Sequence, residues 1–250
     1  MINILYYFLF TIVGLIIGSF LNVLIYRLPR NISIVKPSSF CPKCNKKIAF
    51  YDNIPFFSYI FLMGKCRNCG SKIPIRYPIV EVLTAFLFAL NYYFFNISLT
   101  CLSGIIFTSA LIAVSFIDID FQIIPNQIVL PLTLVGVALS IIINPSKWWV
   151  ILSFSAGAFL FMFLITLIYP KGMGMGDVKL SLMCGAFLVQ KIVPGLFIGF
   201  LAGSLFGVIM IIIKKKKLKQ AIAFGPFISL GALTALFLGD KIISWYLNFI

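Results

Sequence analysis

Long apolar stretches, almost free of charged residues, recur from one end of this 250-residue chain to the other. As helices, such stretches cross about 30 Å of hydrocarbon, where only helices and closed barrels satisfy their own backbone hydrogen bonds. Charged residues make up 10% of the chain and apolar residues 62%, against about a quarter and about half in soluble domains. The sequence therefore predicts an all-α polytopic membrane protein.

The stretches predict about eight transmembrane helices. The first is too long for a signal-peptide core and is followed by no cleavage site, so we expect it to be retained. The sixth is the shortest and is followed by Pro194. The expected spans are 4–26, 78–96, 99–117, 126–143, 148–169, 179–192, 194–213 and 222–240.

The net charge of +14 is concentrated in two segments. Ten of the twenty Lys and Arg residues lie in Arg27–Arg76, and five more lie in Lys214–Lys219. Cytoplasmic loops collect Lys and Arg, so we expect both segments in the cytosol, beside anionic membrane lipid. The basic charge therefore indicates orientation, and no nucleic-acid partner is expected.

The polar stretch 27–77 contains two C-x-x-C pairs separated by twenty-one residues. Each pair offers two thiolates from one tight turn, so the two pairs together suit a tetrahedral zinc site. Disulfides are the alternative, but thiols stay reduced in the cytosol. We predict a structural zinc ion that orders this cytosolic loop between the first and second spans and takes no part in the chemistry. Its ligands would be Cys41, Cys44, Cys66 and Cys69.

Three of the six acidic residues lie at the ends of apolar stretches, where ionisable groups are costly and often functional. Asp118 and Asp120 end the third span, and Asp177 opens the sixth after Gly174 and Gly176. Glycines at these two positions allow unusual backbone angles and close approach of another segment. Alternation of the spans puts all three carboxylates at the cytosolic face. Each one alone could instead cap its helix or lie in headgroup water.

We favour a pair formed by Asp118 and Asp177. Two carboxyls that share a site cannot both ionise cheaply, so one keeps its proton while the other removes a proton from water. Such a pair cleaves peptide bonds without a histidine, and the chain contains none. Asp120 competes with Asp118, but on a continuing helix it points about 200° away. Lys179 is a further candidate for the surroundings of the site.

The motifs together resemble the prepilin leader peptidases, bacterial membrane aspartyl proteases of the G-x-G-D class. The resemblance covers nearly the whole chain, and the ordered set of motifs is far more specific than G-x-G-D alone. Besides the cysteine pairs, it is carried by Gly18-Ser19-Phe20-Leu21-Asn22-Val23, Arg27-Leu28-Pro29, Tyr51-Asp52-Asn53-Ile54-Pro55, Arg76-Tyr77-Pro78 with Glu81, Ile117-Asp118, Ile124-Pro125-Asn126, Gly174-Met175-Gly176-Asp177-Val178-Lys179-Leu180 and Phe224-Gly225-Pro226-Phe227.

The resemblance implies that Asp118 and Asp177 are the catalytic aspartates of a peptidase in the bacterial plasma membrane. Members of the family remove the basic leader of type IV prepilins, secretion pseudopilins or competence pseudopilins after a glycine at the cytosolic face, with no cofactor for proteolysis. Many also methylate the new N-terminus with S-adenosylmethionine, and the cysteine loop is characteristic of these two-activity members. The resemblance therefore implies a bifunctional enzyme.

We expect residues 1–97 to form the methylation region and residues 98–250 a six-helix peptidase region. No glycine-rich fingerprint of a Rossmann-type methyltransferase is present. Asn22, Arg27 and Glu81 are polar groups near the interface beside the zinc loop, and they are our candidates for the methylation region. Ala85 stands where many relatives have glycine, so helix packing near this region can differ.

Two other classes of function remain open at this stage. Membrane carboxylates also serve transporters, although the polar residues here gather at one face and no inverted repeat is found. In a lipid-phosphate sugar transferase, Asp118, Asp120 and Asp177 would hold Mg²⁺. The remaining aspartates, Asp52 and Asp240, are expected to be ordinary loop or span-end residues.

Overall fold

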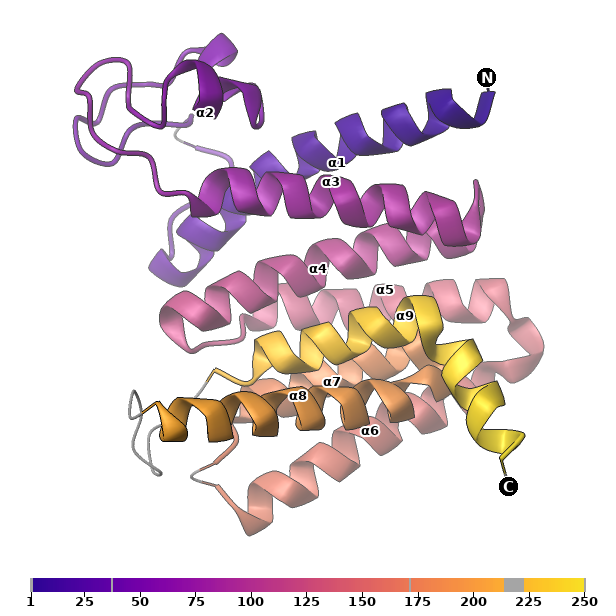
Figure 1. Cartoon of the computed structure of the whole chain (residues 1–250). Helices are drawn as coiled ribbons and strands as arrows, with labels where there is room; N and C mark the ends of the chain where they lie inside the picture. Colours follow the sequence, from indigo (N-terminus) through magenta and orange to yellow (C-terminus); the bar gives the residue numbers. More distant parts are fainter. Residues whose placement is uncertain (1, 37, 171, 214–222, 250) are drawn as a thin grey trace. The chain divides into compact units, whose positions relative to one another are not determined.

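The structure is a computed structural model that describes all residues except 1, 37, 171, 214–222 and 250 (Figure 1). The described residues form helices and two isolated β-bridges but no strand, which confirms the all-α fold. The basic segment Lys214–Lys219 lies outside these residues. Two compact units are present, Met1–Cys101 and Leu102–Ile250, here called the amino-terminal and carboxy-terminal units.

The amino-terminal unit is built on α1 (Ile2–Arg27) and α3 (Arg76–Phe95), with α2 (Phe57–Phe61) in the polar loop between them. The two long helices cross at small residues. A Cβ atom on Gly14 would lie 2.5 Å from the Ala85 Cα, and one on Gly18 would lie 2.7 Å from the Glu81 Cα. Because the backbones touch at these points, any larger side chain would push the helices apart. Ala85 therefore lies within this crossing.

The carboxy-terminal unit contains six helices, of which α4 starts at the boundary with the other unit. Most lie within two residues of the expected ranges, but three differ. Helix α4 continues one turn further, α7 starts and ends four residues earlier, and α9 starts three residues later and ends seven residues later than expected. The helices are α4 (Leu99–Phe121), α5 (Asn126–Ile143), α6 (Trp148–Ile168), α7 (Met175–Leu188), α8 (Ile192–Ile212) and α9 (Gly225–Leu247).

Helix α7 packs against α5, α6 and α9, and nine of its fourteen residues are buried. Serine hydroxyls tie it to its neighbours: Ser140 donates to the Ala186 carbonyl at 2.7 Å, and Ser155 donates to the Leu182 carbonyl at 3.0 Å. Fourteen residues make a helix of only about 21 Å. Because protein surrounds α7, its length does not have to match the thickness of the lipid.

Seven segments of the described chain are long and apolar enough to cross a membrane, which supports a multi-pass membrane protein. One of them, Met175–Ile212, contains both α7 and α8 and reverses direction between them. Lys191, between the two helices, pairs with Asp240 near the end of α9 at 2.6 Å. Further along α8, Gly203 lies beside Phe224 at the start of α9, so α8 runs back towards the end of the unit where α9 begins (Figure 1). The segment therefore contributes two of the eight expected helices.

Candidate active site and cysteine cluster

Asp118 lies in the last turn of α4 and is only 5% exposed. The helix ends just beyond it, because Gln122 adopts a left-handed φ of 54°. The Asp118 Oδ2 atom accepts a hydrogen bond from the backbone N–H of Gly225, the first residue of α9, at 2.9 Å. Exposed N–H groups at a helix start favour a negative charge. The start of α9 therefore holds the Asp118 carboxylate.

Gly225 is a site residue for which the sequence argument assigned no role. A Cβ atom at this position would lie 2.8 Å from the Asp118 Oδ2, so the carboxylate and the backbone fit together only because the residue is glycine. The signal in the sequence was the pair Gly225-Pro226, since proline is common in the first turn of a helix. Which carboxylate the helix would meet depends on packing.

Asp177 lies in the first turn of α7 and is 7% exposed. Its Oδ2 atom accepts a hydrogen bond from the Gly174 N–H at 3.2 Å. The expected unusual backbone angles are wrong for Gly174, which is extended at φ −87° and ψ 154°, and for Gly176, which is helical. Gly176 instead allows the Ile124 side chain to approach the backbone of α7 closely, because a Cβ atom on residue 176 would lie 2.9 Å from that side chain.

These contacts bring the end of α4 and the starts of α7 and α9 to one end of the carboxy-terminal unit. Gly176, next to Asp177, contacts Ile124 in the short loop that follows α4, so the two carboxyls lie at the same end of the unit. Asp120, by contrast, is exposed on another face of α4. The Lys179 ammonium donates to the Asn126 side chain on α5 at 3.0 Å, so it lies beside this group of helix ends. The arrangement suits two carboxyls that act on one bound water.

The four cysteine sulfurs of the polar loop lie within 4.8 Å of one another. The Cys41 and Cys69 sulfurs are 3.8 Å apart. Sulfurs bound at about 2.3 Å in a tetrahedral zinc site are separated by about 3.8 Å. All six cysteines of the chain are free thiols, so the cluster could hold a metal ion, and the disulfide alternative finds no support.

The chain forms the same kind of turn around each of the two cysteine pairs. An antiparallel bridge joins Phe40 to Lys47 around the first pair, and another joins Lys65 to Lys72 around the second. The residue after each pair has a left-handed φ, 55° at Asn45 and 66° at Gly70. Asparagine and glycine tolerate this conformation better than other residues. This local rule was readable from the sequence but was missed.

The electrostatics of the cluster also favour a bound cation. The backbone N–H of Cys44 lowers the pKa of the Cys41 thiol to about 6. Although the Lys46 N–H opposes it, burial together with the neighbouring Cys69 and Cys41 raises the pKa of Cys44 to about 11. Four thiolates in such a small space repel one another, and a divalent metal ion removes that repulsion.

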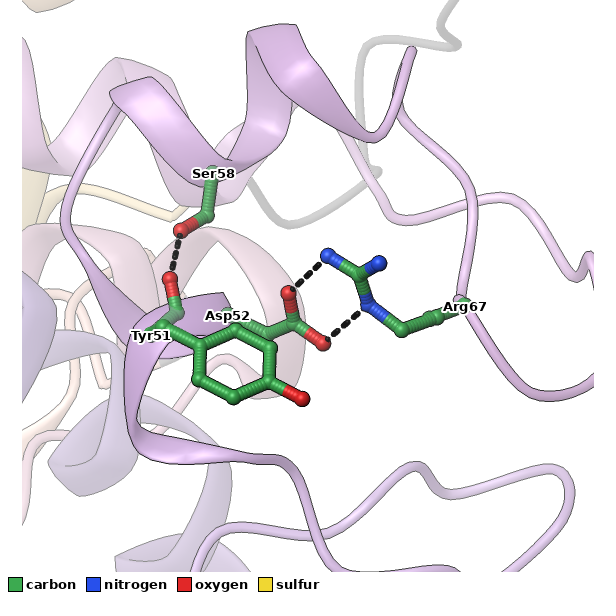
Figure 2. A network of polar contacts seen from close by, with 4 residues as sticks. All are labelled: Tyr51, Asp52, Ser58 and Arg67. Carbon is green, nitrogen blue, oxygen red and sulfur yellow. Dashed lines mark hydrogen bonds and ion pairs between the residues drawn. The ribbon is translucent and has the colours of Figure 1, made fainter.

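Asp52 is more than an ordinary loop residue, contrary to expectation. Its carboxylate receives two hydrogen bonds from the Arg67 guanidinium, at 2.6 and 2.8 Å (Figure 2). Arg67 lies within the second cysteine pair, and next to Asp52 the Tyr51 carbonyl accepts a bond from the Ser58 hydroxyl at 2.9 Å. Figure 2 shows how these contacts connect the middle of the loop to its second cysteine turn.

The Asp52→Asn variant should loosen this part of the loop. Arg67 lowers the pKa of Asp52, so the ion pair contributes fully above the ordinary aspartate pKa of about 3.9 and is lost as the pH falls through the lowered value. At pH 7, we expect hydrogen exchange in residues 50–70 to be about two- to fivefold faster in the variant, a modest effect because Arg67 is largely exposed. The difference from the unmodified protein should shrink below about pH 4. The control is Asp240→Asn, which removes the acidic partner of Lys191 in the other unit and should leave hydrogen exchange in the loop unchanged. An equal effect of both variants would contradict a stabilising role of the Asp52–Arg67 ion pair in the loop.

The candidate methylation residues lie in the amino-terminal unit. The Asn22 side-chain amide on α1 donates to the Tyr77 carbonyl at 3.0 Å, while its Oδ1 atom is buried without a hydrogen-bond partner among the described residues. The Glu81 carboxylate on α3 accepts a 2.7 Å hydrogen bond from the backbone N–H of Phe56. Phe56 has a left-handed φ of 62°, a conformation that costs a bulky residue about 1–3 kcal/mol. Arg27, at the end of α1, donates to the Ser33 carbonyl at 2.9 Å.

Two family models match the chain. Residues 12–95 match the model described as the bacterial peptidase A24 N-terminal domain, and residues 105–212 match that of the type IV leader peptidase family. No solved structure matches the chain.

Curated relatives match nearly end to end. A prepilin leader peptidase/N-methyltransferase of Bacillus subtilis is 37% identical over 95% of this chain and 96% of its own length. Proteins of the same name from Legionella pneumophila and Neisseria gonorrhoeae are 34% and 33% identical, over 97% and 95% of this chain and 96% and 93% of their own lengths. Identity at this level over whole chains, together with the two model matches, shows that the chain belongs to the type IV leader peptidase family.

Proposed function

We propose that this protein cleaves the leader from prepilins and then methylates the new N-terminus. One observation carries the peptidase part: two buried carboxylates, Asp118 and Asp177, stand at neighbouring helix ends and are each held by a backbone N–H. Both lie within the stretch that matches the peptidase family model. The relatives that match the whole chain carry both activities in their name.

In the proposed mechanism, Asp118 and Asp177 hold one water between them. The ionised carboxyl removes a proton from this water, and the protonated one donates its proton to the oxygen of the scissile carbonyl as the water attacks. The N–H of Gly225 and that of Gly174 keep the two carboxyls in position, so little reorganisation is needed during the reaction. Cleavage needs no covalent intermediate and no metal in this scheme.

The distribution of charge supports an active site at the cytosolic face of a bacterial plasma membrane. The stretch from Arg27 at the end of α1 to Arg76 at the start of α3 carries ten of the twenty basic residues, a pattern typical of cytosolic segments. A single-helix substrate with a basic leader would then present its cleavage point at the depth of the two aspartates. Anionic lipid would lie next to the basic loop.

Zinc and S-adenosylmethionine are the two non-protein groups in this proposal. Zinc would be held by the four clustered cysteines and would order the loop without entering the chemistry. S-adenosylmethionine supplies the methyl group when bound, and Asn22, Arg27 and Glu81 are our candidates for its surroundings. The amino-terminal unit would then serve methylation, and the carboxy-terminal unit would serve proteolysis.

Mass spectrometry of a prepilin co-expressed with this protein tests both activities in one measurement. We expect loss of the leader at one bond after a glycine and an added mass of one methyl group on the new N-terminus. With purified protein, cleavage should persist when EDTA is added briefly. Dependence on Mg²⁺ would favour a lipid-phosphate sugar transferase, and ion flux without cleavage would favour a transporter.

The Cys41→Ser variant tests the metal site. Loss of one thiolate should lower bound zinc, measured by elemental mass spectrometry, and should reduce folded protein or methylation before it reduces cleavage, because the loop lies outside the peptidase unit. Cys101→Ser, at a buried cysteine outside the loop, is the matched control and should retain its zinc. Normal zinc content in Cys41→Ser would count against ligation by four thiolates.

A further inference from the structure

The amino-terminal unit contains a cavity of about 470 Å³ where the second half of α1 meets the polar loop. This volume falls within the roughly 300–1,000 Å³ typical of small-molecule sites. One wall is a single face of α1, formed by Ser19, Phe20, Val23 and Arg27 together with Ile16 one turn earlier. The opposite wall comes from two loop segments, one of which is Asn53-Ile54-Pro55. The cavity is therefore formed entirely within this unit.

The lining of the cavity combines an apolar wall with one charged group. Apolar side chains from α1 and the loop alternate with hydroxyl and amide groups, a mixture suited to a ligand that has both a flat apolar part and polar substituents. The Arg27 side chain is 5% exposed. Its guanidinium donates to the Ser33 carbonyl at 2.9 Å and to the Ser38 carbonyl at 3.5 Å, so its positive charge is held in a fixed place in the wall.

A buried acidic residue lies directly behind this wall. Glu81 on α3 is 7% exposed, and its backbone lies against α1 at Gly18, next to the lining residue Ser19. Its carboxylate accepts a hydrogen bond from the Phe56 N–H, which follows the lining segment. This N–H is a neutral donor. A buried carboxylate is stabilised by a nearby cation, so the cavity favours a ligand that places positive charge near Ser19.

We propose that this cavity binds the methyl donor, S-adenosylmethionine, with Arg27 attracting its carboxylate and Glu81 favouring its positively charged sulfonium from behind Ser19. The inference rests on the methyl-transfer part of the proposed function and adds a place and a charge arrangement to it. The donor has a flat nucleobase, a carboxylate and a cationic sulfur, which correspond to the apolar wall, the guanidinium and the buried carboxylate. In this arrangement Glu81 is a positioning residue, since it does not line the cavity and acts on the ligand only through charge.

Filling the cavity should weaken donor binding. For the full-length protein in lipid nanodiscs, calorimetric titration with S-adenosylmethionine should show at least about tenfold weaker binding in Val23→Phe, because a larger side chain occupies the space of the ligand. Val13→Phe makes the same change at an exposed position of α1 that does not line the cavity. This control should bind within about twofold of the unmodified protein. Ser39→Phe fills the same cavity from the loop side and should behave as Val23→Phe does, which keeps the test decisive if one variant folds poorly.

The role of Glu81 is tested with two ligands that differ in one charge. S-adenosylhomocysteine has a neutral thioether where the donor has a sulfonium. Glu81→Gln keeps an oxygen that can accept from Phe56 but removes the charge, so the affinity for the donor relative to S-adenosylhomocysteine should fall by about tenfold. Asp240→Asn removes a charge in the other unit and should leave this ratio unchanged. Distortion of the cavity alone would weaken both ligands equally, and that result would overturn the proposed role of Glu81.

The outcomes separate this proposal from the function on which it rests. Failure of the unmodified protein to bind or use S-adenosylmethionine would overturn methyl transfer itself. Methylation of prepilin by the unmodified protein, together with undiminished donor binding in Val23→Phe and Ser39→Phe, would overturn only the assignment of the cavity. Leader cleavage, which depends on the other unit, reports whether each variant is folded.

Discussion

Replacing Asp118 or Asp177 by asparagine is expected to lower prepilin cleavage at least about 1,000-fold, because neither half of the pair can carry out both proton transfers alone. The amide has nearly the same size as the carboxylate and can still accept the backbone N–H bond, so the helices should stay in place. The measurement is the initial rate of leader removal from a purified prepilin, with thermal unfolding of each variant followed in parallel.

Asp120→Asn is the matched control for this experiment. It makes the same chemical change two residues from Asp118, on a side chain that is exposed rather than buried. We expect its cleavage rate to stay within about threefold of the unmodified protein, as for most exposed substitutions. Leader removal by the double variant of Asp118 and Asp177, or a loss in Asp120→Asn as large as that in Asp118→Asn, would refute the assignment of the pair.

The second large effect is expected from Gly225→Ala. A single added methyl group would lie 2.8 Å from the Asp118 Oδ2, so either the carboxylate must turn away or the start of α9 must move. Either change disturbs the 2.9 Å hydrogen bond that holds the carboxylate. A displacement of about 1 Å in a reacting group can cost about 100-fold in rate, and we expect a loss of that size in the cleavage rate.

Gly157→Ala provides the comparison for a helical glycine. No atom lies within 4 Å of a Cβ built at this position in α6, so cleavage should stay within about twofold and the fold should gain slightly from the better helix former. Methylation of a prepilin peptide supplied without its leader should survive in Gly225→Ala, because Gly225 belongs to the other unit. Normal cleavage in Gly225→Ala would show that the contact with Asp118 does not matter for catalysis.

Each of the two aspartates accepts a hydrogen bond from a backbone N–H at the start of a helix, but the donors come from different parts of the chain. Asp177 is bound by the N–H of Gly174, three residues before it at the start of its own helix. Asp118 stands at the carboxyl end of α4, where helix geometry leaves carbonyl groups unsatisfied, and it depends on the start of α9 for its N–H donor. Only the first of these contacts is local, so only the first could be expected from the G-x-G-D motif.

The α-helical character of the chain and the positions of its helices followed from the sequence, because hydrocarbon forces each spanning segment to satisfy its own hydrogen bonds. The clustering of the four cysteines was also predictable, since each C-x-x-C turn is local and two turns are the number that a tetrahedral ion requires. Local spacing also predicted that Asp118 and Asp120 point in different directions, although it did not say which of the two is buried. These features depend on a few neighbouring residues or on the solvent around a segment.

Tertiary packing alone decided the rest. The Gly225 contact with Asp118 joins residues that are 107 positions apart, and no local preference encodes such a meeting. The same holds for the enclosure of the short α7 and for the Glu81 carboxylate behind the cavity wall, which the Phe56 N–H reaches from the loop. A periodic pattern shows that a face of a helix will be buried, but the atoms that bury it depend on how all the helices fit together in space.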